Sequence, residues 1–421
     1  MGLELRWVGD EDRERVAETR LLCYAPAERL RAEYRERTAT DPLARGGDFL
    51  LAEADGQAVG TTTSLSLDMW VRGGRVPCQG VAWVGTIKTR RRTGQNAEKG
   101  IATRLMQETL SKAREREQAV TALMPFRASF YEHFGYGVVE RRHEWTVPIA
   151  VLRQGACDGV RFYDPARDFA ARSAAKQRLA QAGQCDFERP DALWRRYDQV
   201  AQDGFQVVDR VVGDGPVRAW MYVQHEHVAA PAGDPALGGG KDVLKVVEVG
   251  YQDVAALTRL LHFMASLRDQ YHAVRLTLPA DLPLNLLLRE SQIPHRPVNH
   301  PAASVRPFTR MQVRVLDHGK LLEAIHWPAD LRGKVTVAVQ ETEGYCSTFA
   351  VEVECGRATV TPAKGSPQVA VSDNTWAQIA TGELRASDAW RLKLIAAEDV
   401  AALRVLDGLA QGPVPFTMEY F

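Results

Sequence analysis

The sequence has no run of about 18 apolar residues of the kind that crosses a membrane, and it does not open with a basic segment followed by an apolar signal core. The start MGLELR has Arg6 where a myristoylation signal requires Ser or Thr. The six cysteines are scattered, with no Cys-x-x-Cys pair and no Cys/His cluster at metal-ligand spacing. These absences predict a cytoplasmic protein with free thiols and without a metal.

The chain also lacks an excess of either charge. Lys+Arg and Asp+Glu number 53 each, so no global field attracts nucleic acid or an anionic membrane surface. Any basic patch must be local, and residues 90–92 (RRR) form the clearest one. The 421 residues, 45% hydrophobic and 25% charged, have the balance of globular proteins and are enough for two or three domains.

Residues 1–148 read as a first α/β unit. The patterns predict strands at 3–8 and 81–87, a hairpin with its turn at Asp55-Gly56, an amphipathic helix over 100–116 and a strand over 119–124. A further strand over 142–147 is expected to return and close the sheet.

Residues 149–300 repeat the order strand, helix, strand. After the strand at 243–251 the chain reads GYQDVAALTRLL, with no basic, glycine-containing turn, so a phosphate would find few free amides and no arginine there. We predict a degenerate copy of the first unit, kept for structure or for shaping a pocket.

The proline-rich stretch 294–307 reads as a linker to a third unit, residues 301–421. Short alternating strands, beginning with MQVRVLD, are interspersed with helices, which is typical of an α+β domain. The chain ends on PFTMEYF, an apolar and alternating segment that is unusual for a solvated tail.

The segment from Val81 to Gly137 carries the most chemistry. An apolar strand leads through a basic turn into a helix whose first residues, KGIA, leave amide groups open to a phosphate. A strand edge can pair with an amide-bearing cofactor arm, and coenzyme A has both a pyrophosphate and two amides. A dinucleotide fold would need G-x-G-x-x-G and a P-loop would need GK[ST], and the sequence has neither.

Each of these features also has an ordinary structural interpretation. KGIA alone is more often a plain helix start, and RRR a solvated face. Tyr131, among several aromatic residues, would by itself be a core residue with a hydrogen-bonded hydroxyl. His225 and His227 share a strand face, but no third ligand has suitable spacing for a metal. Glu419 is equally readable as an acidic pocket residue or as an exposed one.

The sequence VGTIKTRRR…KGIATRLM followed by FYEHFGYG resembles the GCN5-related N-acetyltransferases (GNAT), and more narrowly the Eis (enhanced intracellular survival) family. The resemblance covers the whole chain. It implies an active GNAT domain at 1–148, a degenerate second GNAT domain at 149–300 and a domain similar to sterol carrier protein 2 at 301–421. It also implies a homohexamer.

The resemblance implies roles for individual residues. Tyr131 matches the family's general acid, and Phe421 matches the terminal residue whose own carboxylate acts as base. Val84, Gly85 and Thr86 match the strand that holds the pantetheine and the acetyl group, and Phe126 and Arg127 match positions beside the thioester. The positions that match the pyrophosphate loop are Arg91, Arg92, Lys99, Gly100, Ile101, Ala102 and Thr103. One departure is an apparent insertion, TGQNAEK (93–99), which bears on cofactor affinity.

We therefore expect an acetyl-CoA-dependent N-acetyltransferase that acts on a primary amine of a cationic small molecule, aminoglycoside-like by the resemblance. An amine with a pKa of about 10.4 must lose a proton before attack, and the departing thiolate must gain one. Two alternatives stay open. One is acetylation of a protein lysine or a polyamine, and the other is a non-catalytic protein that binds acyl-CoA or an apolar ligand.

Overall fold

The computed structural model describes residues 2–91, 100–200, 204–210, 215–229, 240–293 and 300–421. The chain divides into two compact units, and each is built from separate stretches of sequence. The first unit comprises Met1–Glu140, Arg310–Gly412 and Glu419–Phe421, and the second comprises Arg141–Thr309 and Pro413–Met418.

The first unit contains a mixed sheet with the strand order β1-β2-β3-β4-β5-β15-β6. Its strands are β1 (Glu4–Val8), β2 (Phe49–Ala54), β3 (Gln57–Val71), β4 (Gly74–Thr86), β5 (Val120–Leu123), β6 (Gly137–Val138) and β15 (Gln312–Val315). The helices around it are α1 (Arg13–Tyr24), α2 (Arg31–Ala39), α3 (Ile101–Glu115) and α4 (Ala128–Glu132). The expected hairpin is confirmed, with Asp55 and Gly56 both at positive φ between β2 and β3.

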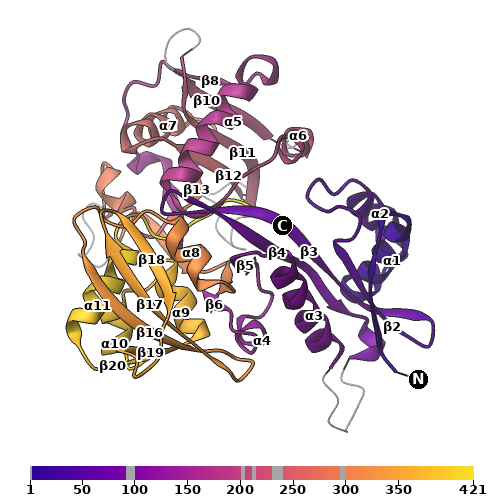
Figure 1. Cartoon of the computed structure of the whole chain (residues 1–421). Helices are drawn as coiled ribbons and strands as arrows, with labels where there is room; N and C mark the ends of the chain where they lie inside the picture. Colours follow the sequence, from indigo (N-terminus) through magenta and orange to yellow (C-terminus); the bar gives the residue numbers. More distant parts are fainter. Residues whose placement is uncertain (1, 92–99, 201–203, 211–214, 230–239, 294–299) are drawn as a thin grey trace. The chain divides into compact units, whose positions relative to one another are not determined.

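Two apolar clusters lie on opposite faces of this sheet. Val81 of β4 packs in a cluster with Met106 of α3, while the next residue, Ala82, packs in a cluster with Val16 of α1. Successive strand residues point to opposite faces, so α1 and α3 cover opposite sides of β4 (Figure 1). The predicted amphipathic helix is confirmed as α3, one residue shorter at each end than expected.

The strand that borders β5 is not the expected one. We expected residues 142–147 to close the first sheet, but β15 pairs with β5 and also with β6. The segment MQVRVLD, which the sequence places in the third region, thus completes the first sheet. All four residues of β15 are buried there. Local alternation is the same for either strand, so it does not encode which sheet a strand joins.

The second unit is built around a sheet with the order β14-β7-β13-β12-β11-β10-β8. Its strands are β7 (Arg142–Pro148), β8 (Val160–Phe162), β10 (Gly204–Arg210), β11 (Val217–Ala229), β12 (Gly240–Tyr251), β13 (Ala273–Pro279) and β14 (Ser304–Phe308). The same unit contains the short strand β9 (Gln184–Phe187) and the helices α5 (Pro165–Ala182), α6 (Asp191–Val200) and α7 (Val254–Ser266).

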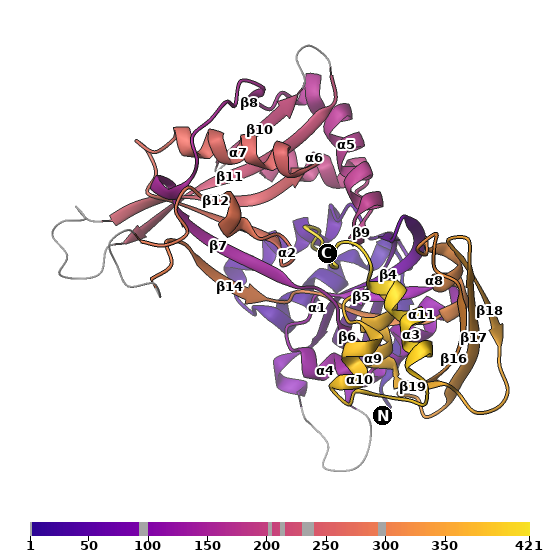
Figure 2. The same cartoon turned by 90° about the vertical axis from the view of Figure 1, so that its left-hand side faces the viewer.

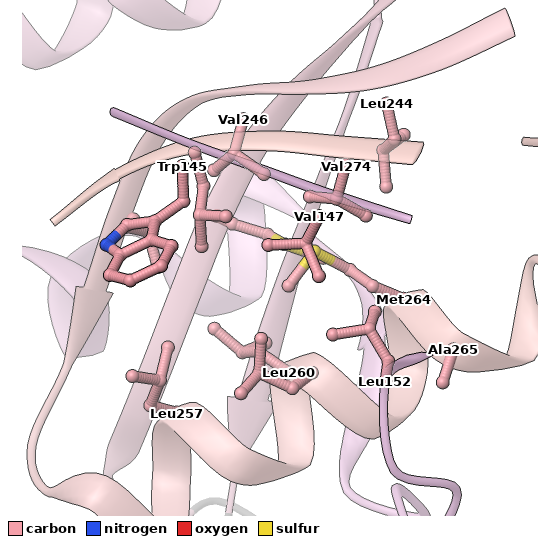
Figure 3. Close-up of a cluster of buried hydrophobic side chains, with 14 of the residues drawn as sticks. Trp145, Val147, Leu152, Leu244, Val246, Leu257, Leu260, Met264, Ala265 and Val274 are labelled. Carbon is pink, nitrogen blue, oxygen red and sulfur yellow. The ribbon is translucent and has the colours of Figure 1, made fainter. Parts of the chain in front are cut away.

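The core of the second unit shows where residues 142–147 belong. Trp145 and Val147 of β7 point into a cluster with Leu257, Leu260 and Met264 of α7 (Figure 3). Strand β7 also pairs antiparallel with β13 along its whole length. The expected closing strand of the first sheet is therefore an inner strand of the second.

The predicted linker is partly a strand. Residues 294–299 lie outside the described residues, but β14 pairs with β7 at the edge of the second sheet. An edge strand tolerates Pro307 because one side of it makes no ladder. The C-terminal segment 415–421 (PFTMEYF), expected to be strand-like, forms no strand in the structure.

The remaining part of the first unit is a separate α+β layer. Its sheet has the order β18-β17-β16-β19-β20, and the buried Trp376 of α9 lies in its core. Helices α9, α10 and α11 gather on one side of this sheet (Figure 2). The elements are α8 (His318–Ala324), β16 (Gly333–Gln340), β17 (Cys346–Glu354), β18 (Arg357–Pro362), β19 (Val369–Ser372), α9 (Asp373–Ala380), α10 (Ala386–Arg391), β20 (Ile395–Ala397) and α11 (Val400–Asp407).

None of the helices in the described residues is long and apolar enough to cross a membrane.

Candidate active site

The two central parallel strands of the first sheet separate near their carboxyl ends. Strands β4 and β5 are paired from Cys78 with Val120 to Val81 with Leu123. Strand β5 ends there and the chain turns away toward Pro125, whereas β4 continues to Thr86. The last residues of β4 thus have no ladder partner on the β5 side within the described chain, which leaves an edge that a ligand carrying amides can pair with.

A β-bulge shapes this free end of β4. The register with β3 shifts between Thr61 and Thr63, which pair with Gly85 and Ala82. Trp83 in the bulge has a φ of 57°, a left-handed conformation that is uncommon for a residue with a side chain. A bulge re-aims the residues around it, and such bulges are common next to active sites.

Helix α1 holds the bulge in place. The Tyr24 hydroxyl donates to the carbonyl oxygen of Val84 at 2.7 Å, and its ring meets the Trp83 ring edge-on. The buried Arg20 guanidinium lies 4.5 Å from the centre of the Trp83 ring and donates to Thr63 Oγ1 at 2.8 Å. Burial lowers the pKa of Arg20 to about 10, so the guanidinium still carries its charge at neutral pH. Sequence reasoning identified neither Tyr24 nor Arg20 as part of the site.

The three predicted pantetheine residues lie at this free end of β4. Val84, Gly85 and Thr86 are all buried. A Cβ atom on Gly85 would lie 2.8 Å from the Cβ of Cys23, so the close packing of α1 on β4 requires glycine here. The packing therefore explains a glycine at position 85 without reference to any ligand.

Tyr131 lies on the α3 side of the sheet. Only 4% of it is exposed, and it packs in the same cluster as Val81, Val84 and Met106. Within the described residues its hydroxyl makes no hydrogen bond, whereas the hydroxyl of Tyr136 is bonded to Thr121 Oγ1 at 2.8 Å. Burial raises the pKa of Tyr131, which keeps the phenol protonated at neutral pH.

Phe421 lies against the other face of β4. Its ring packs on the α1-side cluster, and a Cβ atom built on Gly80 would meet that ring at 3.0 Å. Because Gly80 and Val81 are neighbours on the strand, Phe421 and Tyr131 flank adjacent positions of β4 from opposite faces. Glu419, two residues before Phe421, is buried, so it is not the exposed residue that was one of its two sequence interpretations. Its carbonyl oxygen accepts a hydrogen bond from Arg310 at 2.7 Å.

The predicted phosphate loop is described only in part. Gly100 is the N-cap of α3, and among the residues that the structure describes, its chain neighbours aside, none has an atom within 4 Å of the place a Cβ would take. Ile101, Ala102 and Thr103 form its first turn. The exposed Arg91 contacts the carbonyl oxygen of Thr86 at 3.4 Å. Arg92 and Lys99, with the 93–99 insertion, lie outside the described residues.

The two residues expected beside the thioester are exposed. Phe126 follows the end of β5 with 73% of its surface exposed, and its ring meets Tyr131 edge-on at 5.9 Å. Arg127 is the N-cap residue of α4 and donates to Ser129 Oγ at 3.1 Å. Both lie on the short connection between β5 and the helix that carries Tyr131.

Glu341, Glu343 and Asp373 form an acidic cluster in the α+β layer, where their carboxylate oxygens lie close enough to hold a cation. The side chain of Arg314 is placed among them, however, 3.1 Å from Glu341 and 3.8 Å from Asp373, and it is also paired with Glu343. Burial favours a raised pKa for Glu343, but hydrogen bonds from Arg314 and Arg114 lower it to about 2. Arg314 supplies the positive charge that balances these carboxylates. Because it belongs to β15, its ion pairs join that strand to the α+β layer.

The corresponding helix start in the second unit is closed. Strand β12 ends on Val249-Gly250-Tyr251, as β4 ends on Val84-Gly85-Thr86, and it also contains a bulge near its end. The helix that follows, α7, has Asp253 as its N-cap, and the carboxylate accepts from the Ala256 amide at 2.7 Å. A fixed anion occupies the position where an open amide would receive phosphate.

Comparisons with known proteins identify these parts. Residues 4–139 match a family described as "Acetyltransferase (GNAT) domain", residues 186–315 match a second family with the same description, and residues 319–418 match "Sterol carrier protein domain". The chain thus carries two GNAT domains and a C-terminal domain like sterol carrier protein 2, which confirms the predicted fold class. By these domains it is an acetyltransferase. No curated protein matches the sequence.

Solved structures share this arrangement at low identity. A GCN5-related N-acetyltransferase from Anabaena variabilis has a TM-score of 0.81 at 18% identity. A probable N-acyltransferase of unknown function from Enterococcus faecalis has the same two values. Eis1 from Mycobacterium abscessus has a TM-score of 0.77 at 20% identity. Each match covers 100% of both chains, and at these identities it establishes the fold.

Proposed function

We propose that the protein transfers an acetyl group from acetyl-CoA to a primary amine of a cationic small molecule, with aminoglycosides as the first class to test. The observation that carries the proposal is the separation of β4 from β5, with one candidate catalytic residue on each face of β4. A thioester in this gap would have Tyr131 on the α3 side and Phe421 on the α1 side.

The residues of the first unit fit the donor. The bulged edge at Val84–Thr86 would pair with the two amides of the pantetheine arm. The first turn of α3 would bind the pyrophosphate, with Arg91 close by to add charge. The two parts of coenzyme A are thereby assigned to the end of one strand and the start of the next helix in the chain.

The acceptor would be activated on the α1 side. An unperturbed α-carboxyl group, with a pKa of about 3.3–3.7, is ionised at neutral pH, and the terminal carboxylate of Phe421 would orient the ammonium group and accept its proton. Attack of the free amine on the thioester carbonyl forms the C–N bond and breaks the C–S bond. Holding both reactants in the gap would supply much of the rate.

Tyr131 would serve the departing sulfur. Its raised pKa makes complete proton transfer to a thiolate, whose acid has a pKa of about 8.5, less favourable than for an ordinary tyrosine. The hydroxyl has no protein partner among the described residues, so it is available to donate a hydrogen bond as charge develops on sulfur. We infer that it donates a hydrogen bond to the sulfur while the C–S bond breaks and then gives its proton to the thiolate.

Thiol release from acetyl-CoA, measured with aminoglycosides, polyamines and lysine peptides, tests the proposal. Tyr131→Phe is expected to lower kcat about 100-fold or more. Tyr136→Phe is the matched control, because its hydroxyl is bonded to Thr121 and takes no part in the proposed step. A short C-terminal extension should also lower kcat strongly, whereas the same extension at the N-terminus should not.

The outcomes separate the alternatives. Turnover with lysine peptides or polyamines alone would select the other acceptor class. Acetyl-CoA that stabilises the fold while no amine supports thiol release would favour a non-catalytic carrier. Unchanged kcat for both Tyr131→Phe and the C-terminal extension would refute the mechanism. The homohexamer stays a prediction, and light scattering would show six times the 46.7 kDa chain.

A further inference from the structure

The second unit contains a pocket of its own at the ends of its parallel strands. It has a volume of about 230 Å³ and is lined by the last residues of β12, by Pro279 at the end of β13 and by the last turns of α5. Ligands of α/β sheets commonly bind at the carboxyl ends of parallel strands. The volume is below the usual range of roughly 300–1,000 Å³ for drug-sized ligands, so a small molecule fits it.

The charged side chains in the wall of this pocket are already paired. Lys176 lies 2.5 Å from Asp186. Glu248 accepts from Arg189 at 3.0 Å and from the indole of Trp220 at 3.0 Å. An ionic ligand would have to displace one of these partners and leave its charge desolvated. The rest of the wall is largely aliphatic and aromatic, so the chemistry favours an uncharged, mostly hydrocarbon ligand.

One polar group in the wall is available to such a ligand. Within the described residues the hydroxyl of Tyr251, at the end of β12, makes no hydrogen bond. Burial raises its pKa to about 12, so the phenol is neutral and can donate at physiological pH. A ligand with one hydroxyl or carbonyl oxygen would satisfy it.

The C-terminal segment of the chain forms another wall. Pro413, Val414, Phe416 and Met418 line the pocket, yet this stretch belongs to no strand. Phe416 N donates to the carbonyl oxygen of Gln184 at 2.9 Å, and Val414 N donates to Asp281 at 3.1 Å. The Thr417 hydroxyl also donates to Asp186 at 2.6 Å, and Arg142 donates to the sulfur of Met418 at 3.2 Å. Because the segment forms no strand ladder, a ligand that packs against this wall would add contacts that hold it in place.

We propose that this pocket binds a neutral, largely hydrocarbon small molecule with one hydrogen-bonding oxygen, and that the bound molecule fixes the segment Pro413–Met418. The proposal goes beyond acetyl transfer and does not depend on it, because the pocket lies wholly in the second unit.

The test uses 1-naphthol as probe and the full chain, with binding followed by titration calorimetry. One site is expected. Ala182→Phe, an exposed position at the last turn of α5 that lines the pocket, should weaken binding about tenfold or more by filling the space. Ala174→Phe is the control, because Ala174 is also exposed on the same helix and does not line the pocket. Tyr251→Phe should weaken binding about three- to tenfold by removing the donor.

Hydrogen exchange supplies a second readout that needs no enzyme activity. Saturating 1-naphthol is expected to slow exchange at the backbone amides of Val414 and of residues 416–418, and to leave their exchange unchanged in Ala182→Phe. Three results would overturn the proposal: no binding to the natural chain, equal binding to Ala182→Phe and Ala174→Phe, or binding without protection of this segment.

Discussion

The two GNAT units have the same strand order but treat the start of the helix after their central strand in opposite ways. In the first, the chain runs from Thr86 through a long basic segment to Gly100, the N-cap of α3, and no side chain among the described residues caps this helix by a hydrogen bond. In the second, only Gln252 and Asp253 separate β12 from α7, and the aspartate caps the helix itself. An acidic side chain in place of glycine thus separates a closed helix end in the second unit from a candidate anion site in the first.

The two units also differ in what surrounds their central strands, β4 and β12. In the first unit, candidate catalytic residues flank β4 from both faces, beside Gly80 and Val81. In the second, the corresponding end of β12 borders an apolar pocket with a segment from the far end of the chain as one wall. The same framework thus carries candidate catalytic residues in one unit and an apolar pocket in the other, and the difference lies in side chains rather than in topology.

The largest expected effect concerns the charge held inside the second unit. Asp168 is fully buried and bonded to Arg161 at 2.6 Å and to Arg210 at 2.8 Å. Asp168→Asn should lower the free energy of unfolding by about 3–5 kcal/mol, because it leaves two arginines without their carboxylate. Denaturant unfolding measures this. Asp68→Asn in the first unit, which breaks an exposed pair with Arg75, should cost about 1 kcal/mol or less.

Asp168 also predicts a pH dependence. Burial would raise its pKa, but hydrogen bonds from Arg161 and Arg210 and from a backbone amide lower it to about 2. The unfolded value is about 3.9, so the stabilisation is fully present above about pH 4 and is lost as the pH falls toward 2. The Asn variant should lack this part of the acid destabilisation. If the free energy of unfolding of Asp168→Asn fell between about pH 4 and pH 2 as steeply as that of the natural chain, Asp168 would not be the group responsible.

The next effect tests the helix starts directly. Gly100→Asp gives the first unit the acidic cap of the second and should raise the Kd for acetyl-CoA about 100-fold through repulsion of the pyrophosphate. Calorimetry with acetyl-CoA measures it. Asp253→Gly should leave that Kd unchanged. If Gly100→Asp bound acetyl-CoA normally, the phosphate would lie elsewhere.

A smaller effect concerns the paired glycines near the ends of β4 and β12. A Cβ on Gly85 would lie 2.8 Å from Cys23, and one on Gly250 would lie 2.3 Å from the ring of Trp220. Each alanine variant should lose about 1–3 kcal/mol of stability. Only Gly85→Ala should also raise the KM for acetyl-CoA, which steady-state kinetics would show. Gly319→Ala, which meets nothing closer than 3.5 Å, should be tolerated.

The smallest expected effect is that of Tyr24→Phe. It removes the 2.7 Å hydrogen bond to Val84 and should cost about 1 kcal/mol of stability. If that bond sets the bulge for the cofactor, the KM for acetyl-CoA should rise a few-fold while kcat stays the same. A fall in kcat instead would mean that Tyr24 takes part in the chemistry.

The sequence predicted the parts of this molecule that depend on neighbours along the chain. Asp55-Gly56 specifies its hairpin, and the apolar spacing of 101–113 specifies α3 and its buried face. The sequence did not predict that β15, rather than β7, borders β5. RHEWTVP and QVRV show similar alternation, and the choice of sheet depends on long-range packing. The role of Tyr24 was not predicted for the same reason, since its hydrogen-bond partner Val84 lies 60 residues away in the chain.

The position of β15 has a consequence for how the protein is made. The first sheet lacks an inner strand until residues 312–315 have been synthesised, although the strands beside it, β5 and β6, end at Val138. At typical translation rates this delay lasts roughly 10–35 s. During that time the nascent chain exposes two strand edges that other chains could pair with. Expression of residues 1–148 alone would make that exposure permanent, so we expect such a fragment to aggregate rather than to fold.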